Sequence, residues 1–237
     1  KMKPELSIIV PCYNEEKNIP LILERFKKTI KKRNVEVILV DNGSYDNTEQ
    51  VLKELLPRYP FARTVKVEKN IGYGYGITFG LQHAKGEYVS YTHADMQCDP
   101  KDVLTALDKI KKEPRPKNVL YMGRRGKRPL KDLVFTKGLE MVSSIILLTH
   151  LYDINAQPKL FHKSFLRKLK KPPKNFSLDL YVYYIAKKNG MKIKRVKVAF
   201  AKRKYGQSKS SFSIKAKLKT SLEYLEEIMR LRFSLKR

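Results

Sequence analysis

The sequence has few cysteines and no long apolar run. Cys12 and Cys98 are its 2 cysteines, which cannot form a disulfide framework and lack zinc-site spacing, as is typical of a reducing compartment. The longest largely apolar stretch, residues 141–152, is shorter than the ~20 residues that a membrane span needs. No leader with a basic and then an apolar segment opens the chain. We therefore expect a chain that does not cross a bilayer and holds no thiolate-bound metal.

Acidic side chains are also scarce, because 23 Asp and Glu face 51 Lys and Arg and leave a net charge of +28. Residues 1–100 carry only +2, whereas residues 101–237 carry +26. A surface this basic attracts phosphate groups, whether in nucleic acid, in anionic lipid or in a phosphorylated substrate. The apolar fraction of 42% excludes a disordered tail and predicts one sizeable core.

Apolar periodicity predicts alternating strands and helices in the first half of the chain. Continuous apolar runs predict buried strands at residues 6–10, 35–40, 64–67, 88–92 and 119–122. Helical spacing predicts a helix capped by Asn18, a second from Asp46 with a capping box to Glu49, and others at residues 75–84 and 100–111, the last capped by Asp99. The alternation predicts an α/β fold with a mostly parallel central sheet and helices on both faces.

The regular alternation breaks after Gly123. A basic loop at residues 124–131 precedes a mostly apolar helix at 132–151, and a further helix at 178–188 leads to an exposed strand at 191–200. From residue 213 onwards, apolar side chains lie on one helical face and lysines lie elsewhere. We expect one domain over residues 1–211, followed by a C-terminal amphipathic helix over residues 212–237.

Ligands of an open parallel sheet bind outside the carboxyl ends of its strands, so the polar residues after each strand are candidates. These residues are 11–15, 41–44, 70–74 and 92–97. The dinucleotide fingerprint G-x-G-x-x-G is absent from the sequence, and no glycine-rich loop ends in Gly-Lys-Ser/Thr. A dehydrogenase and a P-loop enzyme are therefore disfavoured.

An ordered set of segments resembles the motifs of glycosyltransferase family 2. The segments are IIVPCYNEEKNI, VDNGSYDNT, NIGYGYGITFGLQHAKGEYVSYTHADMQCDP and KYGQSKSS. The resemblance covers residues 5–211 and is closest to the polyprenyl-phosphate branch, which dolichol-phosphate mannosyltransferases typify. It implies the Rossmann-like, nucleotide-sugar-binding glycosyltransferase A fold and inverting sugar transfer that depends on Mn²⁺ or Mg²⁺. It also implies that residues 1–122 mainly bind the donor and that residues 123–211 mainly bind the acceptor and phosphates.

Asp95 is the carboxylate best placed to bind the metal, because a hard cation with oxygen ligands neutralises the charge of a leaving diphosphate. Gln97 lies two residues further on and is a candidate second ligand, while His93 stands where the family usually has its first Asp. Imidazole accepts Mn²⁺ more readily than Mg²⁺, so we expect a preference for Mn²⁺, or a His93 that only hydrogen-bonds to phosphate. The alternative is that Asp95 merely caps the next helix, although Asp99 already does so.

The resemblance implies two further groups of residues. The donor group is Pro11, Tyr13, Glu15, Asp41, Gly72, Gly74, Asp95 and Arg203. The acceptor and phosphate group is Arg125, Lys137, Gln157, Arg203, Ser208 and Lys209. Their types fit, since an aromatic ring stacks on a base, a carboxylate accepts ribose hydroxyls, a glycine permits close backbone approach and an Arg binds phosphate in bidentate fashion. Turns, solvated loops and a plain bend around Pro158 are the alternatives.

The catalytic candidates are Asp95, Arg125 and Asp179. Asp179 stands near a helix start, where relatives that glycosylate hydroxyl groups carry a catalytic base. A lipid monophosphate, with a second pKa of ~6, is already an anionic nucleophile and needs little help from a base. Asp179 would then position a neighbour or favour the helix N-terminus.

The leading prediction is transfer of a hexose from GDP-mannose or a UDP-hexose to a polyprenyl or dolichyl monophosphate. We expect a peripheral protein on the anionic, cytoplasmic face of the membrane, attached through apolar faces at residues 145–148 and in the C-terminal helix. Core packing or homo-oligomerisation are other uses of those faces. A glycan or lipid-linked oligosaccharide hydroxyl is the alternative acceptor, and a basic module that binds nucleic acid or acidic membrane is the non-enzymatic alternative. Nucleic acid is disfavoured because we identify no RNP-like motif, zinc finger or recognition helix.

Overall fold

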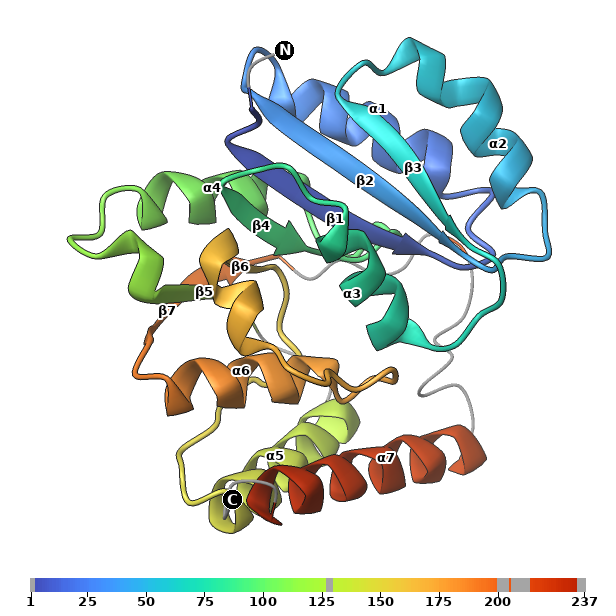
Figure 1. The fold of residues 1–237 in the computed structure, drawn as a ribbon. Coiled ribbons are helices and arrows are strands. Elements are labelled where there is room, and N and C mark those ends of the chain that lie inside the picture. Colours follow the sequence, from blue (N-terminus) through green and yellow to red (C-terminus); the bar gives the residue numbers. More distant parts are fainter. Residues whose placement is uncertain (1–2, 127–129, 200–204, 206–213, 234–237) are drawn as a thin grey trace.

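The computed structural model describes residues 3–126, 130–199, 205 and 214–233. Within these residues, strands form one sheet in the order β3-β2-β1-β4-β6-β5-β7 (Figure 1). The strands are β1 (Leu6–Cys12), β2 (Val35–Asn42), β3 (Ala62–Val67), β4 (Tyr88–Tyr91), β5 (Val119–Arg125), β6 (Lys159–His162) and β7 (Lys192–Val198). All neighbours are parallel except β6, which is antiparallel to both β4 and β5. The predicted α/β class and mostly parallel sheet are confirmed.

Helices cover both faces of this sheet (Figure 1). The helices α1 (Ile19–Ile30), α2 (Thr48–Leu55) and α4 (Pro100–Ile110) lie on one face. The helices α3 (Tyr73–Gln82) and α6 (Leu178–Lys188) lie on the other. Beyond α6, α5 (Leu130–Ile146) and α7 (Ile214–Phe233) pack against each other. No helix in the described part of the chain is long and apolar enough to cross a bilayer.

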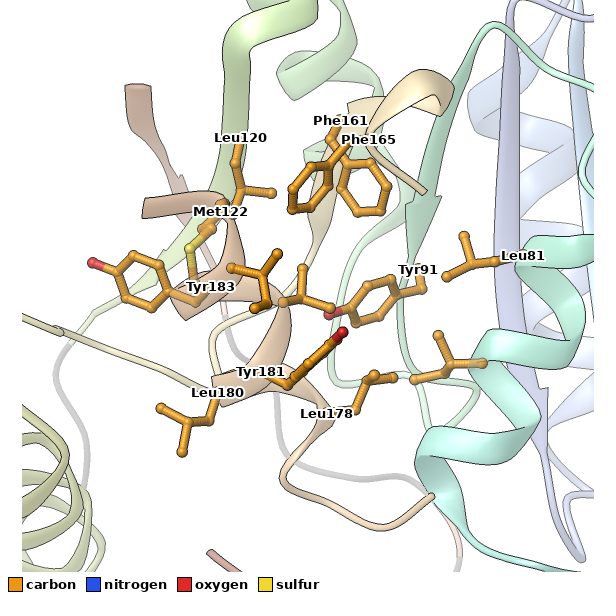
Figure 2. Close-up of a cluster of buried hydrophobic side chains, with 14 of the residues drawn as sticks. Leu81, Tyr91, Leu120, Met122, Phe161, Phe165, Leu178, Leu180, Tyr181 and Tyr183 are labelled. Carbon is orange, nitrogen blue, oxygen red and sulfur yellow. The ribbon is translucent and has the colours of Figure 1, made fainter. Parts of the chain in front are cut away.

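The alternation of side chains along the strands creates two cores, one on each face of the sheet. Ile8 and Val10 of β1 pack with α1 and α4, whereas Ile9 packs with α3 on the opposite face. Burial on both faces explains why β1 and β2 read as continuous apolar runs. Figure 2 shows the second core, in which Tyr91 of β4 and Leu178 of α6 fill the space between the sheet and its helices.

The inner strand β6 is absent from the sequence prediction, which offers Gln157 as an acceptor ligand and a plain bend around Pro158 as its alternative. Only four residues form this strand, and its first residue, Lys159, pairs with Tyr91 of β4 and Met122 of β5. A strand this short, with a lysine at its start, carries no periodicity that separates it from a loop. The same register places segment 153–158 directly over the carboxyl ends of β4 and β5.

The predicted helix caps are confirmed in part. Asn18 occupies the N-cap position of α1 as predicted, but its side chain makes no cap bond, and its Nδ2 donates instead to Glu15 Oε2 at 2.5 Å. The second helix begins at Thr48 rather than Asp46, and Asp46 Oδ1 accepts from the Thr48 N–H at 3.0 Å. Glu49 does not complete a capping box, because it pairs with Lys53 and Lys66 at 2.9 Å each. The Asp99 cap of α4 is confirmed, with its carboxylate accepting from the Lys101 N–H at 2.9 Å.

The helix expected over residues 132–151 is shorter at its end, because α5 stops at Ile146. Leu148 has a φ of +50°, a left-handed conformation that turns the chain away from the helix. Ser144 Oγ then accepts from the Leu151 N–H at 2.9 Å, which closes the turn. The chain then continues through segment 153–158 into β6.

Candidate active site

The carboxyl ends of β1 and β2 lie side by side, because Cys12 pairs with Asp41. Asp41 is 2% exposed, and its Oδ1 accepts from the Ser44 N–H at 3.0 Å. Ser44 Oγ in turn accepts from the Asn14 N–H at 3.1 Å, which ties the two loops together. Burial, followed by the carboxylates of Glu15 and Asp41, raises the pKa of the Cys12 thiol. This corner of the site is acidic, so it suits hydroxyl and N–H donors better than phosphates.

The other residues predicted for the donor base and ribose surround this corner. The ring of Tyr13 packs edge-on against Tyr45 at 5.9 Å between centroids, and Pro11 lies half-buried near the end of β1. The Glu15 N–H donates to Thr48 Oγ1 at 2.9 Å, which anchors the first loop to the start of α2. The structure therefore brings the four predicted donor residues of β1 and β2 together.

The structure gives Gly72 and Gly74 a role different from the predicted close approach to a ligand. A Cβ at Gly72, whose φ is +141°, would overlap the Lys174 carbonyl, and one at Gly74 would overlap the Pro173 carbonyl. The Lys174 oxygen also accepts from the Tyr75 N–H at 3.0 Å. These glycines admit the backbone of the segment that precedes α6, and their predicted close approach to a ligand stays a prediction.

The predicted metal ligands lie in the loop after β4. Asp95 is 4% exposed, and its Oδ1 accepts from the Gln97 N–H at 3.1 Å. Met96, between them, has a φ of +66°, which makes a tight turn. Burial and the nearby Asp95 carboxylate raise the pKa of Cys98 to about 12.

The possible metal ligands in this loop fit a divalent cation that binds together with a nucleotide sugar. Among the described residues, no group of three His, Cys, Asp or Glu side chains is arranged to hold a metal ion. Asp95 and Gln97 supply hard oxygen atoms, and a small divalent cation commonly takes its remaining ligands from substrate phosphates and water. The ring of His93 stacks on Tyr73 at 6.0 Å and 27°, which fixes the plane of the imidazole.

Tyr73, which the sequence reasoning missed, joins the loop after β4 to segment 153–158. Its ring also stacks on Phe176 at 5.0 Å and 16°, and its hydroxyl accepts from Gln157 Nε2. Gln157 is 2% exposed, and its Oε1 has no hydrogen-bond partner among the described residues. A buried acceptor without a donor is costly, so Gln157 is a polar group whose full set of partners the described residues do not supply. Gln157 and His93 therefore contact the same tyrosine, one at its hydroxyl and the other at its ring.

Arg125 ends β5 and is held by a buried carboxylate that the sequence reasoning also missed. Asp153 Oδ1 accepts from Arg125 Nε at 2.8 Å and Nη2 at 2.5 Å, while Oδ2 accepts from the Arg125 N–H at 2.9 Å. Glu140 Oε1 accepts from the Asp153 N–H at 2.7 Å, and Glu140 Oε2 binds Lys137 Nζ at 2.9 Å. Asp and Glu are rare after residue 100, and this rarity is the sequence signal that could have singled out Asp153 and Glu140 as partners of the basic side chains. Two predicted phosphate ligands are thus joined through two carboxylates.

Asp179 lies in the first turn of α6 and is 4% exposed. Its Oδ1 accepts from the Tyr91 hydroxyl at 3.0 Å and forms an ion pair with Lys159 Nζ. The carboxylate is therefore enclosed within the protein, in contrast to the open position that a general base would occupy. Arg203, Ser208 and Lys209, which complete the predicted phosphate ligands, lie outside the described residues.

Residues 7–176 match the sequence profile of Glycosyl transferase family 2. A dolichol-phosphate mannosyltransferase of Pyrococcus furiosus is 26% identical over 233 residues, which are 96% of this chain and 63% of the relative. A dodecaprenyl-phosphate galacturonate synthase of Rhizobium johnstonii is 28% identical over 174 residues, which are 70% of this chain and 50% of the relative. The chain thus spans less than two thirds of the length of either relative.

Two solved structures share the fold. Glucosyl-3-phosphoglycerate synthase from Mycobacterium tuberculosis, in complex with Mn²⁺, UDP and glucosyl-3-phosphoglycerate, has a TM-score of 0.71 at 15% identity and covers 98% of this chain and 79% of that one. A mannosyltransferase from Pyrobaculum calidifontis, in complex with GDP-mannose and Mn²⁺, has a TM-score of 0.62 at 23% identity and covers 86% of this chain and 59% of that one. At these identities the likeness shows the fold alone.

Proposed function

The chain belongs to glycosyl transferase family 2, and on that premise we propose that it moves a hexose from a nucleotide diphosphate sugar to a polyprenyl monophosphate. The observation that carries the proposal is the meeting of donor and acceptor residues at Tyr73. The Tyr73 ring stacks on His93, which shares a loop with Asp95 and Gln97, and the Tyr73 hydroxyl accepts a hydrogen bond from the buried Gln157. In the proposal, residues 1–122 mainly bind the donor and residues 123–211 mainly bind the acceptor and phosphates.

On the donor side, Asp41 and Glu15 accept hydrogen bonds from the ribose or base, and Tyr13 provides an aromatic face. Asp95 and Gln97 would hold a divalent cation, which neutralises the charge that develops on the leaving diphosphate. The structural neighbours bound to Mn²⁺ support this choice of ion by analogy. We keep the preference for Mn²⁺ as part of the proposal, with His93 as a ligand or a hydrogen-bond partner of the phosphate.

On the acceptor side, a phosphate oxygen attacks the anomeric carbon as the bond to the nucleotide diphosphate breaks, which inverts that centre. A monophosphate is anionic near neutral pH, so the attack needs little help from a general base. The enclosed position of Asp179 supports this acceptor over a hydroxyl, because a hydroxyl requires a base that can reach it. Arg125 and Lys137 offer the positive charge that such an acceptor needs.

The outer face of α5 and α7 supports a lipid acceptor at a membrane surface. We call this face the α5–α7 surface; its exposed apolar side chains are Met141, Ile145, Leu148, Leu218, Leu222, Leu225, Met229 and Phe233. Exposed lysines at 215, 217 and 219 flank it. Apolar side chains bordered by lysines match the boundary between acyl chains and anionic headgroups. We propose that the protein binds peripherally to an anionic membrane through this surface.

A groove of about 520 Å³ lies beside α7. It is lined by Asn175, Lys215, Leu218, Lys219, Leu222, Glu223 and Glu226, and Asn175 precedes the Phe176 ring that stacks on Tyr73. Leu218 and Leu222 suit an isoprenoid chain and the two lysines suit a phosphate, whereas the two glutamates would repel that phosphate. The polyprenyl-phosphate and dolichol-phosphate names of the two curated relatives support the same acceptor class.

A panel of GDP- and UDP-sugars with Mn²⁺ or Mg²⁺ tests the proposal. Each donor is offered a short polyprenyl phosphate, the matching polyprenol and a simple glycan, and products are identified by mass spectrometry. We expect one donor to give a polyprenyl phosphate hexose, with more product in Mn²⁺ than in Mg²⁺. Transfer to the polyprenol or glycan alone would overturn the acceptor, and equal or better activity in Mg²⁺ would overturn ligation by His93. The Asp95→Asn variant is the negative control.

A further inference from the structure

Lys159 is the least expected buried residue of the protein. It opens the inner strand β6 and is 0% exposed. Its Nζ donates to the Ile154 carbonyl at 2.9 Å, lies 3.4 Å from the Ala156 carbonyl and forms an ion pair with Asp179. An ammonium group in a protein interior is costly unless its N–H groups are satisfied. The hydrogen-bond acceptors of Lys159 among the described residues lie in segment 153–158 and in α6, and the Tyr91 ring of β4 lies 5.8 Å from the ammonium.

Asp179 is fixed from a third element of the fold. Tyr91 of β4, also 0% exposed, donates its hydroxyl to Asp179 Oδ1 at 3.0 Å. Figure 2 shows Tyr91 extending from the sheet toward α6, in the core between them. Burial lowers the pKa of Lys159, and the adjacent Asp179 carboxylate opposes that effect. Lys159, Asp179 and Tyr91 therefore join β6, α6 and β4 beneath segment 153–158.

Segment 153–158 carries the acceptor-side contacts, each to a different element. Asp153 binds Arg125 at the end of β5, and Gln157 binds the hydroxyl of Tyr73 on α3. Asn155 Oδ1 lies 2.8 Å from the hydroxyl of Tyr224 on α7. The side chains of this segment thus reach the proposed substrate residues, while its carbonyls at 154 and 156 point to Lys159.

We propose that Lys159 and Asp179 are positioning residues, which hold segment 153–158 so that Gln157 and Arg125 face the acceptor. The expected effect on acceptor turnover rests on the proposed function. The claim that Lys159 and Asp179 hold segment 153–158 in place does not depend on it. Asp179 has no proton-transfer role in this arrangement. It neutralises and orients the ammonium of Lys159, which in turn fixes the two carbonyls.

The proposal predicts a specific consequence for each half of the reaction. Loss of the Lys159 ammonium leaves the Asp179 carboxylate buried without its cation and frees the carbonyls of residues 154 and 156. Segment 153–158 then loosens, and Gln157 and Arg125 lose their fixed placement. The donor corner at Asp41 and the Asp95 loop belong to other strands, so donor binding is expected to persist.

The experiment compares Lys159→Met, Lys159→Arg, Asp179→Asn and the double variant Lys159→Met/Asp179→Leu with the unmodified chain. Lys163→Met is the matched control, because Lys163 also donates to a backbone carbonyl, that of Ala84, away from the segment. The readouts are hydrogen exchange of the amides of residues 153–158, nucleotide diphosphate affinity by calorimetry, and kcat and KM for the acceptor. The double variant removes both buried charges and keeps the test valid if a single variant does not fold.

We expect amide exchange in segment 153–158 to be at least tenfold faster in Lys159→Met and in the double variant, and unchanged in Lys163→Met. We expect kcat/KM for the acceptor to fall at least tenfold, while nucleotide affinity stays within twofold and Lys159→Arg recovers part of the loss. Unchanged exchange in the segment would overturn the proposal. So would loosened exchange with normal acceptor kinetics, or an Asp179→Asn variant that loses the acid limb of the pH–rate profile while its segment stays fixed.

These readouts separate this inference from the proposed function. If no nucleotide sugar and polyprenyl phosphate support transfer, the proposed function fails, but the exchange of segment 153–158 still decides whether Lys159 and Asp179 hold it. If transfer occurs in the unmodified chain and the variants keep both the segment and the kinetics, only the positioning role fails.

Discussion

Asp153 binds Arg125 through three N–H groups, because its carboxylate accepts from Nε, Nη2 and the main-chain nitrogen of that residue. Asp153 is 1% exposed, so Arg125 supplies the cation that its buried charge requires. The side chain that the sequence assigns to phosphate binding is therefore also structural. A phosphate would contact the part of the guanidinium that faces away from Asp153.

Replacement of Arg125 by Ala is expected to lower the free energy of unfolding by about 3–5 kcal/mol, because a buried carboxylate loses its cation. Urea unfolding measures this change. Arg124→Ala is the control, because Arg124 is the exposed neighbour of Arg125 and its loss leaves the Asp153 ion pair in place. A loss of less than about 1 kcal/mol, within the usual range of surface ion pairs, would show that solvent already screens the pair.

Asp95→Asn is expected to reduce kcat by about 100-fold or more, because the leaving diphosphate loses its main source of charge neutralisation. Stability is expected to change little, and steady-state assays over a Mn²⁺ titration measure the effect. Asp99→Ala, four residues further on, should lose about 1 kcal/mol of stability as the α4 cap is removed, with normal kcat. Equal losses of kcat in both variants would contradict a metal role that belongs to Asp95 alone.

Gly123 lies against the carbonyl of Gln157, and its N–H donates to the Pro158 carbonyl at 2.9 Å. A Cβ at Gly123 would overlap that Gln157 carbonyl, so Gly123→Ala should push segment 153–158 outward. We expect a loss of about 1–3 kcal/mol in urea unfolding, as for other overpacked sites, together with a lower kcat/KM for the acceptor. Gly126→Ala has open space around its Cβ and should change neither quantity. If Gly123→Ala changed neither the free energy of unfolding nor kcat/KM, segment 153–158 would have to shift without an energetic penalty, which would contradict this prediction.

Asp102 gives the protein a pH dependence that differs from the usual acid sensitivity of carboxylates. Burial, followed by the nearby Asp99, raises the pKa of Asp102 from 3.8 to about 6. Between these values the folded state binds more protons than the unfolded state, so stability falls as the pH rises through this window. Above about pH 6 the penalty is fully present, and it amounts to about 1 kcal/mol once solvent screening of this half-exposed group is allowed for.

Asp102→Asn should therefore be more stable than the unmodified chain at pH 7.5, and the gain should shrink at pH 4.5, as measured by urea unfolding. Asp108→Asn, on the same helix, is the control, and it should lower the free energy of unfolding at pH 7.5. Arg33 donates to the Asp108 carboxylate at 2.7 and 2.8 Å and lowers its pKa, so this ion pair stabilises the fold at pH 7.5. A gain in Asp102→Asn that is equal at both pH values would contradict titration of Asp102 as its cause.

Leu222→Glu on the α5–α7 surface is expected to weaken binding to vesicles of anionic phospholipid at least tenfold. The side chain is 52% exposed, so the change places a charge in the apolar face without disturbing the core. Co-sedimentation at low salt measures the effect. Lys32→Glu adds negative charge at an exposed position after α1 and should weaken binding far less. Equal effects of both variants would indicate that net charge alone, rather than this face, governs membrane binding.

The sequence by itself determined the α/β alternation and indicated where the proposed donor residues lie. Strands β1 and β2 are buried on both faces, so their apolar runs and the polar residues after them, such as Asp41, are visible without tertiary information. Asp95 is likewise marked by its place directly after β4. These signals are local because each depends on a few consecutive residues and on the rule that ligands bind at the carboxyl ends of parallel strands.

Only the tertiary structure decided which partner each buried polar group has. Gln157 meets Tyr73 from 84 residues away, and Asp179 meets Tyr91 from 88 residues away, at separations that no local pattern encodes. The antiparallel strand β6 and the burial of Lys159 have the same origin, since a lysine before two apolar residues is compatible with a loop or a strand. A buried charge is tolerated only where the fold supplies its partners, and those partners are fixed by packing between distant elements.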